Sequence, residues 1–130
     1  MCRLAELHTN FDSTVMVAEN KLDILRFIID TASQCSKIDA IILFSSTLDE
    51  RCRDDSDIDI VIISNATLSV LSRQKSFTKF KKDLYLKNMS QKYDFLYFKS
   101  MDEIKSQQDK SPLCNELVRN GQFIYRKQVA

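Results

Sequence analysis

Residues 56–63 read Ser-Asp-Ile-Asp-Ile-Val-Ile-Ile, and they are the most informative part of the sequence. Alternating Asp and Ile followed by an unbroken apolar run is typical of a strand that leaves solvent and enters a core. Because side chains alternate along a strand, Asp57 and Asp59 point to the same face, with their Cβ atoms about 7 Å apart. Two carboxylates held in this way repel each other unless a cation, open solvent or a raised pKa compensates.

A divalent cation is the usual compensation for such a pair, and oxygen-only ligands select Mg²⁺ or Mn²⁺. Asp94 lies near the start of the aromatic stretch 93–98 and supplies a third carboxylate if that stretch pairs beside residues 57–63. Three carboxylates that hold two metal ions stabilise the attacking and leaving oxygens of phosphoryl or nucleotidyl transfer. The alternative is that Asp57 and Asp59 form only a solvated edge, which is the commoner role of such a pair taken alone.

The remaining pattern predicts helices and strands in alternation. Helices are expected over 22–32, 67–88 and 111–121, and strands over 38–44, 57–63, 93–98 and 122–126, with a loop or short helix over 45–56. Ser111, Pro112 and Gly121 are well placed to cap, start and end the last helix. The expected fold class is α/β (α+β), a single small mixed sheet flanked by helices. Residues 1–18 show no period and are expected to be a weakly defined N-terminal extension of one domain, residues 19–130.

Composition excludes several classes of protein. The chain has 130 residues, 44% of them hydrophobic, and its longest apolar runs (40–44 and 60–63) are too short to span a membrane. With one Gly and one His, it lacks the glycines of a dinucleotide fingerprint or P-loop and the ligands of a His-rich zinc site. The four cysteines form no C-x-x-C motif and no signal peptide is recognisable, so reduced thiols and a cytoplasmic location are expected.

A basic segment offers a separate hypothesis. Residues 73–92 contain seven Lys or Arg and a single acid, Asp83. Such a segment can bind nucleic acid or another acidic partner, or it can be the solvated side of an amphipathic helix. Its aromatic residues fall at core spacing and do not interleave with the basic ones as a stacking platform would, so the helix is favoured and nucleic acid is not expected.

Several separated motifs agree with one known family. Phe44-Ser45-Ser46 is followed after nine residues by Ser56-Asp57-Ile58-Asp59, and Tyr93-Asp94-Phe95-Leu96 comes later. In this order and spacing the chain resembles the DNA polymerase β-like nucleotidyltransferase superfamily, and within it the minimal nucleotidyltransferases of bacteria and archaea. Their signature is Gly-Ser, a spacer, Ser-Asp-x-Asp with aliphatic residues, and a third Asp on a later strand. The resemblance covers about residues 20–127 and implies the polymerase β palm-like fold.

The resemblance also implies an activity. Asp57, Asp59 and Asp94 would be the catalytic carboxylates and the Mg²⁺ (or Mn²⁺) ligands, and Asp94 would help to deprotonate the acceptor hydroxyl. Ser46 would bind a triphosphate oxygen at the start of a short helix. The other nucleotide-binding residues would be Ser45, Ser56 and Arg53. The reaction would transfer a nucleoside monophosphate, with AMP from ATP as the expected case, to a hydroxyl acceptor and release pyrophosphate.

Departures from the signature leave a second function open. The family's glycine is Ser45 here, and its later Ala-x-Gly is Leu48-Asp49-Glu50. Two acids near a site for a polyanion could weaken nucleotide binding, whereas Arg51 and Arg53 could offset them. The alternative is therefore a catalytically degenerate, antitoxin-like module that masks a partner. In the minimal family that partner is a small helical HEPN protein, and a second copy of the chain is the other candidate.

Overall fold

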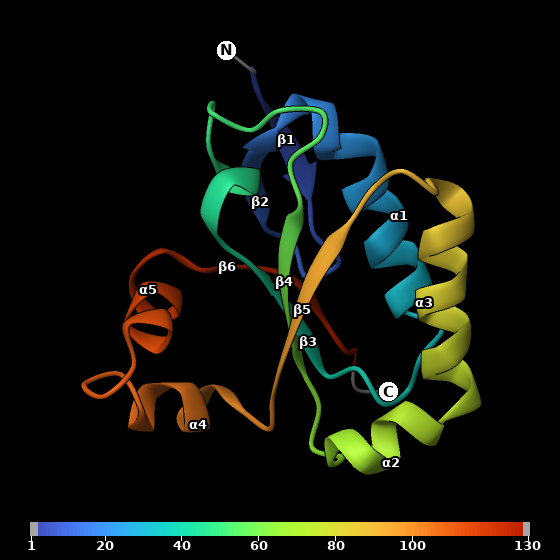
Figure 1. Cartoon of the computed structure of the whole chain (residues 1–130), viewed down its shortest axis with the longest axis vertical. Coiled ribbons are helices and arrows are strands. Elements are labelled where there is room, and N and C mark those ends of the chain that lie inside the picture. The colour runs from blue at the N-terminus through green and yellow to red at the C-terminus, as the bar shows by residue number, and fades with distance from the viewer. Residues whose placement is uncertain (1–2, 129–130) are drawn as a thin grey trace.

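The computed structural model describes residues 3–128 and contains one mixed four-stranded sheet (Figure 1). Its strands are β3 (Ala40–Leu43), β4 (Ile58–Ile63), β5 (Tyr93–Phe98) and β6 (Gln122–Arg126), in the order β5-β4-β3-β6. Strand β3 runs antiparallel to β4 and β6, and β4 runs parallel to β5. The mixed sheet and its flanking helices confirm the predicted fold class.

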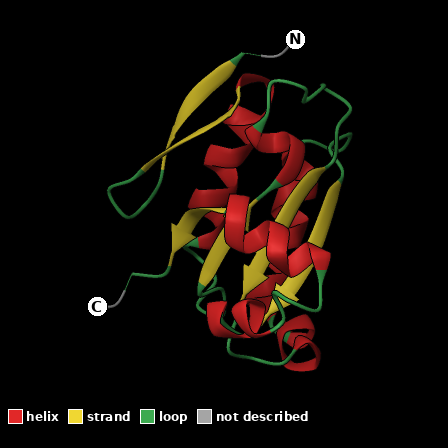
Figure 2. Ribbon diagram, turned by 90° about the vertical axis from the view of Figure 1, so that its left-hand side faces the viewer, coloured by secondary structure: helices red, strands yellow, loops and turns green. Residues whose placement is uncertain are grey.

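Helices cover both faces of this sheet, as the views in Figures 1 and 2 show. One face packs on α1 (Leu22–Ala32) and α3 (Lys75–Lys87), and the other on α4 (Met101–Ser106) and α5 (Pro112–Asn120). Along β4, Ile60 and Ile62 point into the first core, whereas Val61 and Ile63 point into the second. By the same alternation Asp59 lies on the face that α4 and α5 cover in part.

The N-terminal segment is better ordered than its sequence predicts. Strands β1 (Leu4–His8) and β2 (Thr14–Ala18) form an antiparallel hairpin, a second small sheet beside the first. Its buried residues Leu7, Val15 and Val17 join the core on the α1 side. The expectation of a weakly defined extension over residues 1–18 is therefore wrong for the described part, because the hairpin contributes to the main core. The short 3₁₀ helix η1 (Glu19–Lys21) joins it to α1.

The segment predicted as one helix over 67–88 is two helices. Helix α2 (Leu68–Arg73) begins at Thr67, whose side chain accepts a hydrogen bond from the Val70 amide. Gln74 then adopts extended backbone angles (φ −75°, ψ 129°), so α3 sets off in a new direction. The apolar side of α3 is buried through Phe77, Phe80 and Leu84, which agrees with the amphipathic interpretation of the basic segment.

The closing helix has the predicted boundaries. The Ser111 side chain accepts a hydrogen bond from the Cys114 amide, and Pro112 occupies the first turn of α5. Gly121 ends the helix at a negative φ of −64°, so it is not needed for a left-handed backbone. It is needed for space, because a Cβ there would lie 2.5 Å from the Leu117 carbonyl oxygen and 2.9 Å from Ile42 Cγ2.

Within residues 3–128, no helix is long and apolar enough to cross a lipid bilayer. Cys35 and Cys114 carry buried thiols that form no disulfide, as expected, and Cys52 is also buried. Cys2 lies outside the described residues.

Candidate active site

The three predicted carboxylates come to one end of the parallel strand pair. Asp59 on β4 and Asp94 on β5 are direct partners in the register of these strands, whose backbones lie about 4.8 Å apart. Asp57 precedes β4 by one residue and is exposed, as is Asp94, whereas Asp59 is half-buried. In the parallel pairing of β4 with β5, the register of the two strands makes Asp59 and Asp94 neighbours. The structure thus brings Asp94, predicted from a separate motif, next to Asp59.

Asp59 is in an environment that disfavours its charge. Burial raises the pKa of its carboxyl above the ordinary value, and the negative charges of Asp94 and then Asp57 raise it further. A hydrogen bond from the Ser45 side chain lowers the pKa and opposes these effects without cancelling them. The arrangement therefore holds an excess of negative charge that a cation placed among the three carboxylates would relieve.

Ser45 reaches Asp59 from the segment that follows β3. Residues Ser45–Leu48 form the 3₁₀ helix η2, directly after the extended Phe44. Ser45 has a φ of 67°, in the left-handed region that glycine adopts readily and residues with a Cβ adopt at a cost. From there its hydroxyl donates to the Asp59 carboxylate. Residue 45 thus links the turn after β3 to the carboxylate of β4.

Comparison with known proteins identifies the family of the chain. The family model for polymerase β nucleotidyltransferases matches residues 26–129, most of the chain. The chain belongs to the polymerase β nucleotidyltransferase family. Its fold is also similar to a solved structure of a mutant toxin–antitoxin pair, MntA–HpeT, with a TM-score of 0.51 and 19% sequence identity over 80% of this chain and 74% of the other. No curated protein sequence matches the chain significantly. The resemblance to the polymerase β-like nucleotidyltransferase superfamily is thereby confirmed.

In this nucleotidyltransferase the left-handed residue falls where the family signature has glycine. Ser45 adopts a conformation that favours glycine although it carries a Cβ and a hydroxyl. Ser46 follows it as a half-buried residue of η2, where its carbonyl accepts the amide of Asp49 at 2.9 Å.

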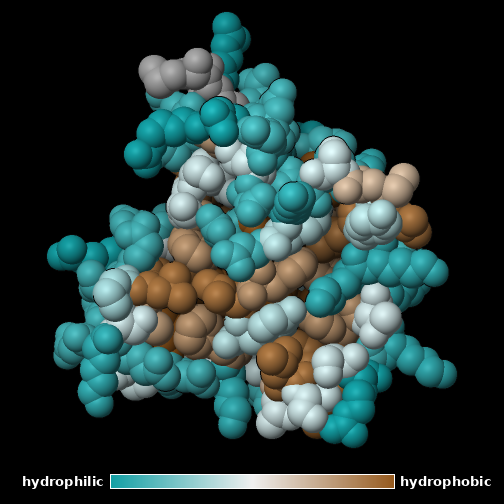
Figure 3. Space-filling model, in the orientation of Figure 1, coloured by the Kyte–Doolittle hydropathy of each residue, from teal (hydrophilic) through white to brown (hydrophobic). Residues whose placement is uncertain are grey.

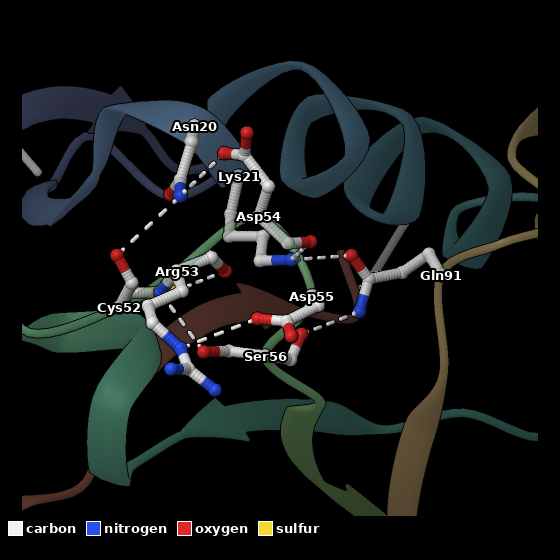
Figure 4. Close-up of polar contacts among 8 residues, drawn as sticks. All are labelled: Asn20, Lys21, Cys52, Arg53, Asp54, Asp55, Ser56 and Gln91. Atoms are coloured by element: carbon white, nitrogen blue, oxygen red, sulfur yellow. Dashed lines mark hydrogen bonds and ion pairs between the residues drawn. The ribbon is translucent and has the colours of Figure 1, made fainter.

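Arg53 and Ser56, the other two predicted nucleotide-binding residues, lie in the loop that enters β4. The Ser56 hydroxyl accepts the Arg53 amide at 2.9 Å, so in the nucleotidyltransferase it shapes the turn before Asp57 (Figure 4). The Arg53 side chain lies 3.3 Å from Asp55, and both are well exposed. Arg51 pairs with Asp49 at 2.7 Å. Each arginine thus has a surface acid as its neighbour.

The donor set fits a hard divalent cation. Asp57, Asp59 and Asp94 offer carboxylate oxygens alone, the ligands that Mg²⁺ and Mn²⁺ prefer. The raised pKa of Asp59 comes first from burial and then from the negative charges of Asp94 and Asp57, and such an ion would offset that repulsion. Among residues 3–128, no three acidic, His or Cys side chains already stand close enough together to form a metal-binding group. The fit accordingly rests on donor chemistry and on charge.

Two features of the segments that flank the predicted site have no counterpart in the sequence prediction. The first is a cavity of about 560 Å³ beside η2, lined among others by Met16, Leu48, Arg51 and Asn120. It depends on β2 and α5 meeting η2, which no local pattern shows. The second is the buried Lys21, which hydrogen-bonds to the loop before Asp57. A lysine between a strand and a helix gives no signal of burial in the sequence.

Proposed function

We propose that this chain is a Mg²⁺-dependent nucleotidyltransferase that transfers a nucleoside monophosphate, AMP from ATP, to a hydroxyl acceptor. The observation that carries the proposal is the register pairing of Asp59 with Asp94, with Asp57 immediately before the same strand. Family membership supports the reaction class. The choice of ATP and of magnesium follows from the resemblance to minimal nucleotidyltransferases and from the all-oxygen donor set.

Each carboxylate has a distinct role in this proposal. Asp57 and Asp59 would hold the cation, which supplies charge stabilisation to the phosphate oxygens when it is bound. Asp94, the exposed partner on β5, would accept the proton of the acceptor hydroxyl. The hydroxyl oxygen forms a bond to the α-phosphorus while the bond from that phosphorus to the bridging oxygen breaks. Pyrophosphate leaves with that electron pair, so charge and atoms balance.

Thermal unfolding with ATP, with Mg²⁺, with both and with neither tests the nucleotide site. A ligand at 100 times its Kd stabilises the native state by about 2.7 kcal/mol. With an unfolding entropy of about 2.1 cal/mol/K per residue, this raises the Tm of a chain of this length by about 10 °C. We expect the rise only with ATP and Mg²⁺ together, and its loss in Asp59→Asn. An unchanged Tm in the wild type would contradict nucleotide binding.

A second function is favoured by the Ser45 contact. The Ser45 hydroxyl donates to a carboxylate that metal binding needs, and the acids Asp49 and Glu50 follow η2. These departures favour a module of the same fold that has lost catalysis and acts by masking a partner. Asp59→Asn separates the two functions, because partner binding by a degenerate module would not depend on this carboxylate, whereas AMP transfer would be abolished.

The partner in either case is proposed to be a HEPN-type helical protein. Partly buried apolar residues gather on the α4–α5 side of the sheet, the side on which Asp59 lies. Figure 3 shows apolar surface across this part of the molecule, with hydrophilic residues around it. The MntA–HpeT structure, a toxin–antitoxin pair, supports a partner of this kind. Incubation with α-³²P-labelled ATP and a candidate HEPN-type protein would label that protein if it is the acceptor.

A further inference from the structure

Lys21 is almost completely buried, with 2% of its surface exposed, and it lies at the end of η1. Its ammonium donates to the Asp54 carbonyl oxygen at 2.8 Å and to Gln91 Oε1 at 2.7 Å (Figure 4). Both acceptors are neutral oxygens. Removing an ammonium from water is costly unless hydrogen bonds replace hydration, so a lysine kept at this position must make these contacts well.

The two acceptors belong to the two segments that carry the site carboxylates. Asp54 lies in the loop that leads through Ser56 to Asp57, and Gln91 lies in the turn that leads to Asp94 on β5. Neighbouring Asn20 strengthens the first attachment, because its amide donates to Asp54 Oδ1 at 3.0 Å. Residues 20 and 21 therefore hold the loop before β4 from the side of α1.

Gln91 closes the link between the two segments. Its side-chain amide donates to the Ser56 carbonyl at 3.0 Å and to the Lys92 carbonyl at 2.7 Å. The Ile58 amide donates to the same Lys92 carbonyl at 3.0 Å, which begins the pairing of β4 with β5. A continuous set of hydrogen bonds thus runs from Lys21 through Gln91 to the residues on either side of Asp57.

We propose that Lys21 is a positioning residue that, through Gln91, fixes Asp57 relative to Asp59 and Asp94 for cation and nucleotide binding. The expected effect on cation and nucleotide binding rests on the proposed function, whereas the link between the two segments rests on the hydrogen bonds alone. Lys21 is a positioning residue because its contacts are with the backbone and side chain of flanking residues. The ammonium suits this role, since charge-assisted hydrogen bonds can join two acceptors from distant segments.

Lys21→Met tests the inference, because methionine keeps an unbranched apolar chain and removes the donor. Lys87→Met is the matched control. Lys21 and Lys87 both line a cavity of about 340 Å³, but the Lys87 ammonium lies 3.9 Å from Asp23 and over the Phe27 ring, both on α1. Gln91→Leu removes the other partner of the Lys21–Gln91 hydrogen bond at a half-buried position, and it replaces Lys21→Met in the test if that variant does not fold. Two quantities are measured: amide hydrogen exchange, and Mn²⁺ affinity in the presence of a non-hydrolysable ATP analogue.

We expect Lys21→Met to speed exchange at amides 56–59 and 92–94 at least tenfold, and to weaken Mn²⁺ binding at least tenfold. Lys87→Met should stay within twofold of the wild type in both. Exchange that rises equally in α5 would show a global loss of stability and overturn the inference, as would unchanged exchange or unchanged Mn²⁺ affinity in Lys21→Met. If the wild type binds no Mn²⁺ with the analogue, the proposed function fails, and the exchange data alone decide whether Lys21 fixes these segments.

Discussion

Replacing Ser45 by glycine and by alanine measures what the left-handed backbone costs this protein. Both substitutions remove the hydroxyl that donates to Asp59, so they differ only in the Cβ at a φ of 67°. A residue with a Cβ is disfavoured in this conformation by about 1–2 kcal/mol. The glycine variant loses about 0.4–1 kcal/mol of this advantage over the alanine variant, because an unfolded chain with glycine has more conformational entropy to lose on folding.

The net expectation is that Ser45→Gly is more stable than Ser45→Ala by about 0.5–1 kcal/mol. For a chain of this length, with about 2.1 cal/mol/K of unfolding entropy per residue, the difference is about 2–4 °C in Tm. Thermal unfolding followed by circular dichroism, without ligand and at neutral pH, is sufficient to measure it. Equal melting temperatures, or a more stable alanine variant, would refute the assignment of a left-handed backbone to residue 45.

The same pair of variants addresses the two proposed functions. If the Ser45 hydroxyl competes with a cation for Asp59, both variants bind Mg²⁺ and ATP more tightly than the wild type. If the Cβ itself obstructs the triphosphate, only Ser45→Gly does so, because alanine keeps the Cβ. Titration of each variant with ATP at fixed Mg²⁺, followed by calorimetry, distinguishes these outcomes. Wild-type affinity in both variants would show that residue 45 does not impair the site.

Asp59→Asn should stabilise the ligand-free protein at neutral pH but not below pH 4. The folded-state pKa of Asp59 is raised, so the neutral carboxyl, which the fold tolerates better, is present at low pH. As the pH rises through that pKa the carboxyl becomes charged and its contribution to stability is lost, whereas Asn stays neutral. Melting temperatures of both proteins between pH 3.5 and 7 check this, and a constant difference would contradict it. Gly121→Ala should cost about 1–3 kcal/mol in a urea titration, since the added Cβ would lie 2.5 Å from the Leu117 carbonyl oxygen, and a neutral result would contradict that crowding. Leu7→Ala should cost about 2–5 kcal/mol because Leu7 is fully buried, whereas Met16→Ala, at 47% exposure in the same hairpin, should cost less than about 0.5 kcal/mol; comparable losses would show that the hairpin does not belong to the core.

Local patterns were sufficient to predict the strands that carry the site. The alternation around Asp57 and Asp59 and the aromatic run after Asp94 each mark a strand, and the capping residues of the last helix mark its ends. Local patterns could not show that β5 lies beside β4, because strand pairing depends on segments far apart in the sequence. The family resemblance implied this placement, and the register of Asp59 with Asp94 agrees with it.

The missed elements have particular physical causes. In β2 the exposed residue between Val15 and Val17 is Met16, so an apolar side chain on the outer face conceals the alternation of the strand. The division of the 67–88 helix falls at Gln74, where neither Pro nor Gly marks a break. Helix α4 did carry a signal: the Ser100 side chain accepts the Glu103 amide, as in a capping box, but the helix is too short for a clear period.

The parallel pairing of β4 and β5 has a consequence for the order in which the protein folds. Strands β3 and β4 are antiparallel neighbours joined by a local connection, whereas β5 reaches β4 only after α2 and α3 have crossed over between them. Closing this longer connection costs chain entropy before any contact between β4 and β5 can offset the cost, and such non-local pairings form slowly. Asp59 and Asp94 therefore meet after β3 and β4 have paired, whereas β6 joins β3 across a still longer stretch of chain and pairs later. During synthesis on the ribosome, a chain that ends before β5 can hold the first two carboxylates of the site but not the third.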